Sequence, residues 1–185
     1  MLYTRKGDDG TTKVIGSTDR FSKGSLITHA IGTLDETNSF LGLCRAKAGD
    51  FLIEIAEEKI RLNDLILEVQ NDLFIIQAEL AGAPKKIVPE KIKRMEKIID
   101  GIESILPPIK SFLIPGETEL GALLDIARTV VRRAERQMLK AREGKMAEFS
   151  DETLTYINRL SSLCYALARL ASTKGGIKEK SPDYR

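Results

Sequence analysis

The sequence predicts an all-α protein, a five-helix bundle with an extended N-terminal arm. Apolar residues recur at three- and four-residue intervals in five separate stretches, which is the pattern of helices with one buried face. Short segments containing Gly or Pro join these stretches, and none has the alternating pattern of a half-buried strand. At 185 residues a single domain is expected, divided into an arm (1–30), a helical bundle (31–174) and a flexible tail (175–185).

The arm and the first two helices follow in order. Residues 1–30 are rich in Gly, Thr, Ser and Asp and carry no sustained helical period, so we interpret them as the arm. A first helix is predicted from Asp35 to about Ala48. A second helix has a long apolar stripe from Leu62 to Leu80, and its start is placed near Phe51.

The last three helices have clearer boundaries. Pro89 can open a helix that runs to about Leu106, just before two consecutive prolines. A fourth helix is predicted over 118–143 and ends before a glycine, and a fifth over 151–174 has Ser150 as its N-cap. The remaining tail is polar and is expected to be loose.

Composition excludes several classes of protein. With 29 basic and 27 acidic residues the net charge is only +2, which is too little to drive general binding to nucleic acid. The start of the chain lacks the pattern of a secretory signal, and no apolar stretch is long enough to span a bilayer. Cys44 and Cys164 lie outside any metal or redox motif, so reduced thiols and a cytoplasmic location are expected.

The densest group of charged residues lies in the run ARTVVRRAER of the fourth predicted helix. At about 100° per residue, three of its polar side chains share one arc beside the buried face and a fourth lies at the edge, whereas Arg133 points elsewhere. Paired guanidinium groups in such a place suit phosphate oxygens, so a triphosphate site is one interpretation. The alternative is an exposed helix face neutralised by a glutamate. We call these residues the arginine face: Arg128, Arg132, Glu135 and Arg136.

Polar residues also interrupt the apolar run of the fifth predicted helix. Asn158 and Ser162 are four residues apart and share a face, and Arg159 adjoins them. These groups could meet the arginine face in one cleft. The alternative for Asn158 and Arg159 is an ordinary hydrogen-bonding pair between helices.

The arm holds a second candidate anion site in the run TRKGDDGTTKVIG. Its glycines permit turns in which successive backbone N–H groups face one anion, and hydroxyl and basic side chains can add donors. A turn without any ligand is the alternative. The side chains and turns concerned belong to Thr4, Arg5, Gly7, Gly10, Thr11, Thr12 and Lys13.

Acidic residues and the single histidine carry less information. Asp35 opens the first predicted helix, where a carboxylate caps the helix and complements its dipole, although it could also fix a nearby guanidinium group. His29 has no neighbours at metal-ligand spacing, so no metal site is predicted.

Taken together, five motifs resemble the ATP:cob(I)alamin adenosyltransferases of the propanediol-utilisation (PduO) type in order and spacing. They span residues 3–169 and read TRKGDDGTT, GTLDETNSFLG, FLIPGE, ARTVVRRAER and YINRLSSLCYALAR. The resemblance implies transfer of the 5′-deoxyadenosyl group of ATP to the cobalt of reduced cobalamin, with release of triphosphate. It also implies a homotrimer that binds ATP and corrinoid where neighbouring subunits meet.

The resemblance further implies roles for individual residues. Asp35 would pair with Arg128 across the subunit boundary, and Phe112 would lie against the cobalt, so these three residues and Arg132 are the expected catalytic residues. A core position beside a proline loop is the alternative for Phe112. The expected nucleotide-binding residues are Thr4, Arg5, Gly7, Asp8, Gly10, Thr12, Lys23, Arg132, Glu135, Arg136, Asn158 and Arg159.

This chemistry makes modest demands on side chains. Cobalt in its lowest oxidation state is itself the nucleophile, so no catalytic His or Cys is needed. The protein must align C5′ of ATP with cobalt and neutralise the departing triphosphate, a task for Arg, Lys, backbone N–H groups and Mg²⁺. A cobalamin reductase and an adenosylcobalamin-dependent mutase are candidate protein partners.

Two positions depart from the family pattern. Glu117 stands where the family usually has a glycine, and Ser162 stands where it usually has an aspartate. Both departures concern the corrinoid side of the predicted site. The alternative from another class of protein is a non-catalytic helical adaptor that binds ATP, polyphosphate or an acidic partner through the arginine face without turnover.

Overall fold

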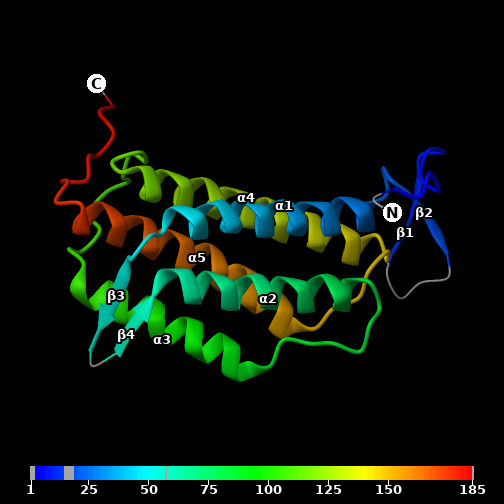
Figure 1. Cartoon of the computed structure of the whole chain (residues 1–185), viewed down its shortest axis with the longest axis horizontal. Coiled ribbons are helices and arrows are strands. Elements are labelled where there is room, and N and C mark those ends of the chain that lie inside the picture. Colours follow the sequence, from blue (N-terminus) through cyan, green and yellow to red (C-terminus); the bar gives the residue numbers. More distant parts are fainter. Residues whose placement is uncertain (1–2, 15–18, 57, 185) are drawn as a thin grey trace.

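The computed structural model describes residues 3–14, 19–56 and 58–184. In this part of the chain, five helices and two short hairpins form an elongated bundle (Figure 1), which confirms the predicted all-α fold. The helices are α1 (Leu26–Lys47), α2 (Leu62–Leu80), α3 (Pro89–Ile105), α4 (Glu119–Glu143) and α5 (Asp151–Lys174). The antiparallel strand pairs are β1 (Thr11–Lys13) with β2 (Arg20–Ser22), and β3 (Leu52–Ile55) with β4 (Glu58–Arg61).

Helices α4 and α5 form the centre of the bundle. Helix α1 packs on α4 and α2, and α3 packs on α5. Helices α1 and α4 run antiparallel, because Lys47 forms an ion pair with Glu119 at one end (2.7 Å) while Leu26 lies against Gly144 at the other. With 25 residues, α4 is roughly 37 Å long, which sets the length of the molecule.

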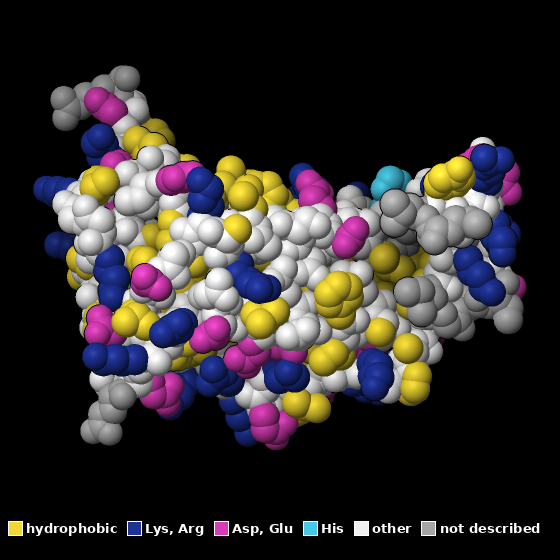
Figure 2. Space-filling view, viewed as in Figure 1, with side chains coloured by type: hydrophobic (Ala, Val, Ile, Leu, Met, Phe, Trp, Pro, Cys, Tyr) yellow, Lys and Arg dark blue, Asp and Glu magenta, His cyan; other side chains and the backbone are white. Residues whose placement is uncertain are grey.

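The core is one continuous apolar cluster to which all five helices contribute. It includes the fully buried side chains of Leu34, Leu73, Leu124 and Ile157. Figure 2 shows basic and acidic side chains interspersed over the face in view. Among the described residues, no helix is long and apolar enough to cross a membrane.

The boundary between arm and bundle differs from the prediction. Helix α1 begins at Leu26, nine residues before the predicted start at Asp35. Ile27 and Ala30 are buried on the same face as Leu34, so the helical period was present in the stretch assigned to the arm. The low helix propensity of Gly32 and the neighbouring threonines hid this period in the sequence. The helix forms there because tertiary packing outweighs that low propensity.

The β3–β4 hairpin occupies the place predicted to begin the second helix. Helix α2 starts at Leu62 rather than near Phe51. Ile53 and Ile55 are buried, and Ile55 lies so close to Gly101 of α3 that a Cβ there would approach it to 2.9 Å. A strand of four residues gives too short an alternation to be recognised in the sequence.

The other helix ends agree with the prediction. Thr118 caps α4 by accepting a hydrogen bond from the backbone N–H of Gly121 (3.0 Å), and Ser150 caps α5 through the N–H of Thr153 (3.4 Å). The tail contacts the rest of the chain, since the backbone N–H of Ile114 donates to the carbonyl oxygen of Lys180 (2.8 Å). The described part of the tail therefore lies against the loop that follows α3.

Candidate active site

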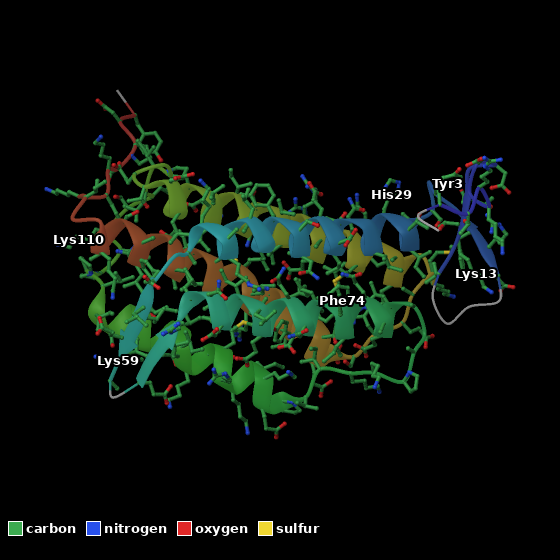
Figure 3. The ribbon with its side chains drawn as sticks, viewed as in Figure 1. Tyr3, Lys13, His29, Lys59, Phe74 and Lys110 are labelled. Atoms are coloured by element: carbon green, nitrogen blue, oxygen red, sulfur yellow. The ribbon has the colours of Figure 1, made fainter. Side chains whose placement is uncertain are left out.

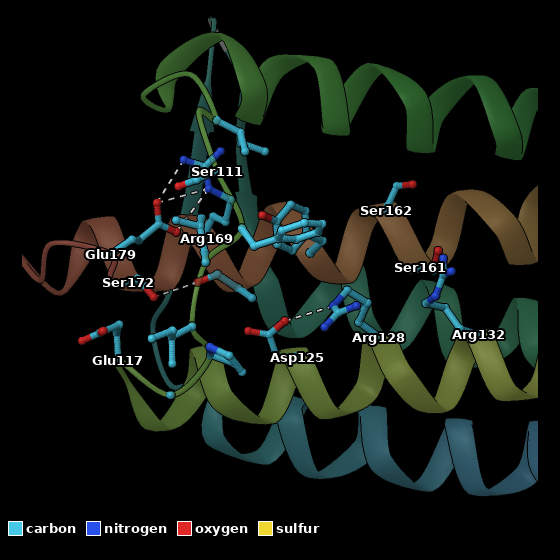
Figure 4. Close-up of a pocket in the computed structure, with 18 residues that line it drawn as sticks. Ser111, Glu117, Asp125, Arg128, Arg132, Ser161, Ser162, Arg169, Ser172 and Glu179 are labelled. Atoms are coloured by element: carbon cyan, nitrogen blue, oxygen red, sulfur yellow. Dashed lines mark hydrogen bonds and ion pairs between the residues drawn. The ribbon is translucent and has the colours of Figure 1, made fainter. Parts of the chain in front are cut away.

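A cavity of about 660 Å³ opens at one end of the bundle, between the loop that follows α3 and the helices α4 and α5 (Figure 4). Phe112 of this loop lines the cavity and leaves 79% of its surface exposed. That exposure excludes the alternative of a core position for Phe112. Glu117 and Ser162, the two positions that depart from the family pattern, also line the cavity.

Two residues of the arginine face reach this cavity from α4. The Nε of Arg128 donates to Asp125 Oδ1 (3.0 Å), and its Cζ lies 5.8 Å from the ring centroid of Tyr165 on α5. Arg132 follows one turn later, is exposed, and has no hydrogen-bond or ion-pair partner in the described part of the chain. Its guanidinium group is therefore available to an anionic ligand.

The other half of the arginine face joins α4 to α5. Asn158 Nδ2 donates to Glu135 Oε1 (3.1 Å), so polar groups of the two helices do meet. Arg159 donates to Asn158 Oδ1 (3.0 Å) and, on its other side, to Glu96 Oε1 of α3 (2.8 Å). Arg159 is thus held by a carboxylate that the sequence did not single out.

Arg133 and Arg136 have different surroundings from each other. Arg133 forms an ion pair with Glu36 on α1, which confirms that it points away from the arc of Arg128 and Arg132. Arg136 is exposed and has no hydrogen-bond or ion-pair partner among the described residues. It lies one turn beyond Arg132, where it extends the positive surface of α4.

A buried ion pair shapes the far wall of the cavity. Arg169 of α5 is only 7% exposed; it forms hydrogen bonds to both carboxylate oxygens of Glu179 in the tail (3.0–3.2 Å) and to the carbonyl oxygen of Pro107 (2.9 Å). These contacts tie the tail and the start of the Phe112 loop to α5. Burial raises the pKa of Tyr165, which lies on the same wall. The sequence offered no signal for this pair, because its partners are brought together only by the fold.

The arm forms an ordered turn closed by the β1–β2 hairpin. Lys23 Nζ donates to the carbonyl oxygen of Gly7 (2.7 Å), and the backbone N–H of Lys23 donates to the carbonyl oxygen of Gly10 (2.9 Å). Gly10 has a φ of 79°, in the left-handed region that favours glycine. The exposed residues Thr4, Arg5 and Asp8 lie on this turn, and Thr12 lies in the hairpin paired with Phe21.

Two residues that the sequence analysis did not select also hold the arm together. Arg20 Nε donates to Thr11 Oγ1 (2.7 Å), and Asp9 Oδ1 accepts from the N–H (2.9 Å) and the hydroxyl (2.7 Å) of the same threonine. These hydrogen bonds from Thr11 lower the pKa of the Asp9 carboxyl. Hydrogen bonds within the arm therefore hold the turn in place.

One chain does not bring the two predicted halves of the site together. The arm lies beyond the N-terminus of α1, next to the end of α4, whereas the cavity lies at the start of α4. Lys13 of the arm and Lys110 of the loop beside the cavity accordingly lie at opposite ends of the bundle (Figure 3). Within one chain, Asp35 is exposed on α1 and Arg128 pairs with Asp125, so the predicted contact between Asp35 and Arg128 of neighbouring subunits stays a prediction.

The fold defines a helical-bundle protein with a cavity lined in part by arginines, and comparison with known proteins identifies its family. The model of the cobalamin adenosyltransferase family matches residues 2–171. The chain is 36% identical to a corrinoid adenosyltransferase of Bacillus subtilis over 181 residues, which cover 95% of this chain and 89% of that protein. This chain belongs to the cobalamin adenosyltransferase family.

Other similar proteins are also named as corrinoid adenosyltransferases. The corrinoid adenosyltransferase PduO of Salmonella typhimurium is 39% identical over 176 residues, which cover 91% of this chain and 48% of that protein. A Phe-to-Ala variant of the PduO-type ATP:corrinoid adenosyltransferase from Lactobacillus reuteri, solved with cobalamin and ATP, has a TM-score of 0.85 and 28% identity. Its alignment covers 98% of this chain and 99% of that one.

An Arg-to-Lys variant of the Lactobacillus reuteri enzyme, solved with ATP, has the same TM-score of 0.85. These findings confirm the resemblance predicted from the five motifs. They do not favour the non-catalytic adaptor, because the matching proteins are named as enzymes.

Proposed function

We propose that this chain transfers the 5′-deoxyadenosyl group of ATP to the cobalt of a reduced corrinoid and releases triphosphate. The Co(I) electron pair forms the cobalt–carbon bond to C5′, and the triphosphate leaves with the electrons of the broken C5′–O bond. The observation that carries the proposal, beside family membership, is a cavity faced by Arg128 and by Arg132, which has no ion-pair partner within residues 3–14, 19–56 and 58–184. Positive groups there would stabilise the charge that develops on the leaving group.

The proposed roles follow the position of each residue. Arg132, Arg136 and the arm turn would hold the triphosphate, and the Asn158–Glu135 pair would hold the rest of the nucleotide. Phe112, exposed at the mouth of the cavity, would present an apolar surface to the lower face of cobalt. The corrinoid would occupy the cavity of about 660 Å³.

Magnesium would enter with ATP as part of the substrate. Among the described residues, no group of three or more His, Cys, Asp and Glu side chains could hold a metal ion. Mg²⁺ commonly keeps several waters and binds through substrate phosphates rather than through an all-protein cage. The proposed substrate is therefore the Mg²⁺–ATP complex.

The proposed assembly is a homotrimer with its sites between subunits. Its support is the separation of the arm from the cavity along α4, which is roughly 37 Å long. An arm from a neighbouring subunit could complete a site that one chain leaves open, and Asp35 of one subunit would then pair with Arg128 of the next. We also propose a cytoplasmic location, with a cobalamin reductase and an adenosylcobalamin-dependent mutase as protein partners.

The test is to mix the purified protein with ATP, Mg²⁺ and chemically reduced cobalamin and to follow the visible spectrum in the dark. The expected product is an alkyl-cobalt species that is destroyed by light, together with one triphosphate for each cobalt alkylated. Formation of ADP or phosphate without the alkyl-cobalt spectrum would contradict the proposal.

A further inference from the structure

Asp125 of α4 lines the cavity and belongs to none of the groups assigned above. Its side chain is only 17% exposed, and one oxygen accepts the hydrogen bond from Arg128 Nε at 3.0 Å. No other residue in the described part of the chain donates a hydrogen bond to this carboxylate. A carboxylate withdrawn from water in this way depends on its single cationic partner.

Arg128 is constrained from two sides. Asp125 holds its Nε, and the ring of Tyr165 lies below its Cζ at 5.8 Å. Its terminal nitrogens have no acceptor among the described residues, so they remain available for a ligand or a neighbouring subunit. Figure 4 shows Asp125 and Arg128 projecting together from α4 into the cavity, with Arg132 one turn further along.

We infer that Asp125 is a positioning residue for the adenosyl transfer: it fixes the guanidinium plane of Arg128 before substrate or a neighbouring subunit arrives. This inference rests on the proposed function. An arginine side chain has several rotatable bonds, and a fixed plane reduces the ordering required when the terminal nitrogens meet their acceptor. Asp125 and any outside acceptor use different nitrogens, so the two contacts are compatible.

A double-mutant cycle tests the inference. Asp125→Asn keeps the shape of the side chain but removes the charge, and should lower kcat by about ten- to a hundredfold through misplacement of Arg128. Because Asp125 is inferred to act only through Arg128, Asp125→Asn combined with Arg128→Ala should be no slower than Arg128→Ala alone. KM for ATP should change less than kcat, since Arg132 and the arm are untouched.

Glu68→Gln is the matched control. Glu68 forms a comparable carboxylate–guanidinium pair with Arg94 (2.9 Å) between α2 and α3, away from the cavity. It should leave kcat unchanged, and the melting temperature of Asp125→Asn should fall no further than that of Glu68→Gln. A loss of activity matched by an equal loss of folded protein would overturn the positioning role.

Two other results would also overturn it. The first is multiplicative losses in the double variant, which would mean that Asp125 acts independently of Arg128. The second is wild-type activity of Arg128→Ala, which would leave Asp125 with nothing to position. If the wild-type protein makes the alkyl-cobalt product, either of these results with the variants refutes this inference alone. An inactive wild-type protein would instead refute the proposed function.

Discussion

Arg132 and Arg133 are adjacent in sequence but have different surroundings. Arg132 faces the cavity without a partner among the described residues, whereas Arg133 pairs with Glu36 on α1. We expect Arg132→Ala to lower kcat by at least about a hundredfold, because triphosphate charge would be left uncompensated in the transition state. Helical content by circular dichroism should not change, since the side chain is exposed.

Arg133→Ala provides the control on the same helix. An exposed ion pair of this kind contributes at most about 1 kcal/mol to stability, so this variant should keep both fold and turnover. Equal turnover by Arg132→Ala and the wild-type protein would mean that other residues hold the triphosphate.

Phe112 permits a separation of two steps. We expect Phe112→Ala to fail with cob(II)alamin and a mild reductant, because water or the axial ligand would return to cobalt and hinder its reduction. With cob(I)alamin prepared chemically, the variant should retain much of its activity, since alkyl transfer then needs only positioning and charge stabilisation.

The exposure of Phe112 sharpens this prediction. Truncation of a buried phenylalanine would lower the free energy of unfolding by about 3–5 kcal/mol. Truncation of a side chain that is 79% exposed should leave the melting temperature almost unchanged. Leu67→Ala, which truncates an exposed apolar side chain on α2, is the control and should affect neither assay. Equal losses of Phe112→Ala in the two assays would count against a role at cobalt.

The two cysteines should be unreactive in the folded protein. Burial raises the pKa of the Cys44 thiol to about 11 and raises that of Cys164 further, so the reactive thiolate is scarce at pH 8. We expect a thiol reagent such as Ellman's reagent to label neither residue in buffer and both in denaturant. Rapid labelling of the native protein, or inactivation by the reagent, would contradict this.

At the scale of elements, a buried polar cluster attaches α3 to the bundle. Asp72 of α2 accepts hydrogen bonds from Lys91 of α3 (2.5 Å) and from the hydroxyl of Tyr156 on α5 (2.9 Å), and it is only 2% exposed. Burial, together with the charge of Asp72, raises the pKa of Tyr156 well above its ordinary value. The cluster therefore joins three helices through one carboxylate.

We expect Asp72→Asn to lower the free energy of unfolding by about 1–3 kcal/mol, because a buried hydrogen-bonded charge is lost while its partners stay in place. The measurement is the urea midpoint by circular dichroism. Glu68→Gln, which breaks a half-exposed pair with Arg94, should cost no more than about 1 kcal/mol. A smaller loss for Asp72→Asn than for Glu68→Gln would show that the cluster does not stabilise the attachment of α3.

At the scale of the whole molecule, the separation of arm and cavity predicts an oligomer with shared sites. We expect sedimentation equilibrium to give three times the mass of the 20.5 kDa chain. A fully active monomer at micromolar concentration would exclude shared sites.

Complementation tests the sharing directly. Arg132→Ala damages the cavity half of a site, and a Thr12→Ala/Lys23→Ala variant damages the arm half. Each should be weakly active alone, but trimers formed by co-expression should regain activity, because some interfaces combine two undamaged halves. Mixtures no more active than the average of the two variants would contradict the model.

Several features of this protein were predictable because they are local. Helical periodicity fixed the fold class and the boundaries of α3, α4 and α5, since apolar spacing and capping residues act within a few positions. The arc of Arg128, Arg132 and Glu135 follows from helix geometry alone. The hydrogen bond between Asn158 and Glu135 agrees with the prediction that polar groups of the fourth and fifth helices meet. The order of the five motifs indicated the family.

Other features depended on contacts between distant segments. The β3–β4 hairpin is stable because Ile55 packs against α3, and a four-residue strand carries too little pattern to be recognised alone. The cavity wall requires Arg169, Glu179 and the carbonyl oxygen of Pro107, which is 62 residues away from Arg169 in sequence. The position of the arm at the opposite end from the cavity was decided by the antiparallel packing of α1 on α4, because sequence patterns specify which face of a helix is buried but not which helix covers it.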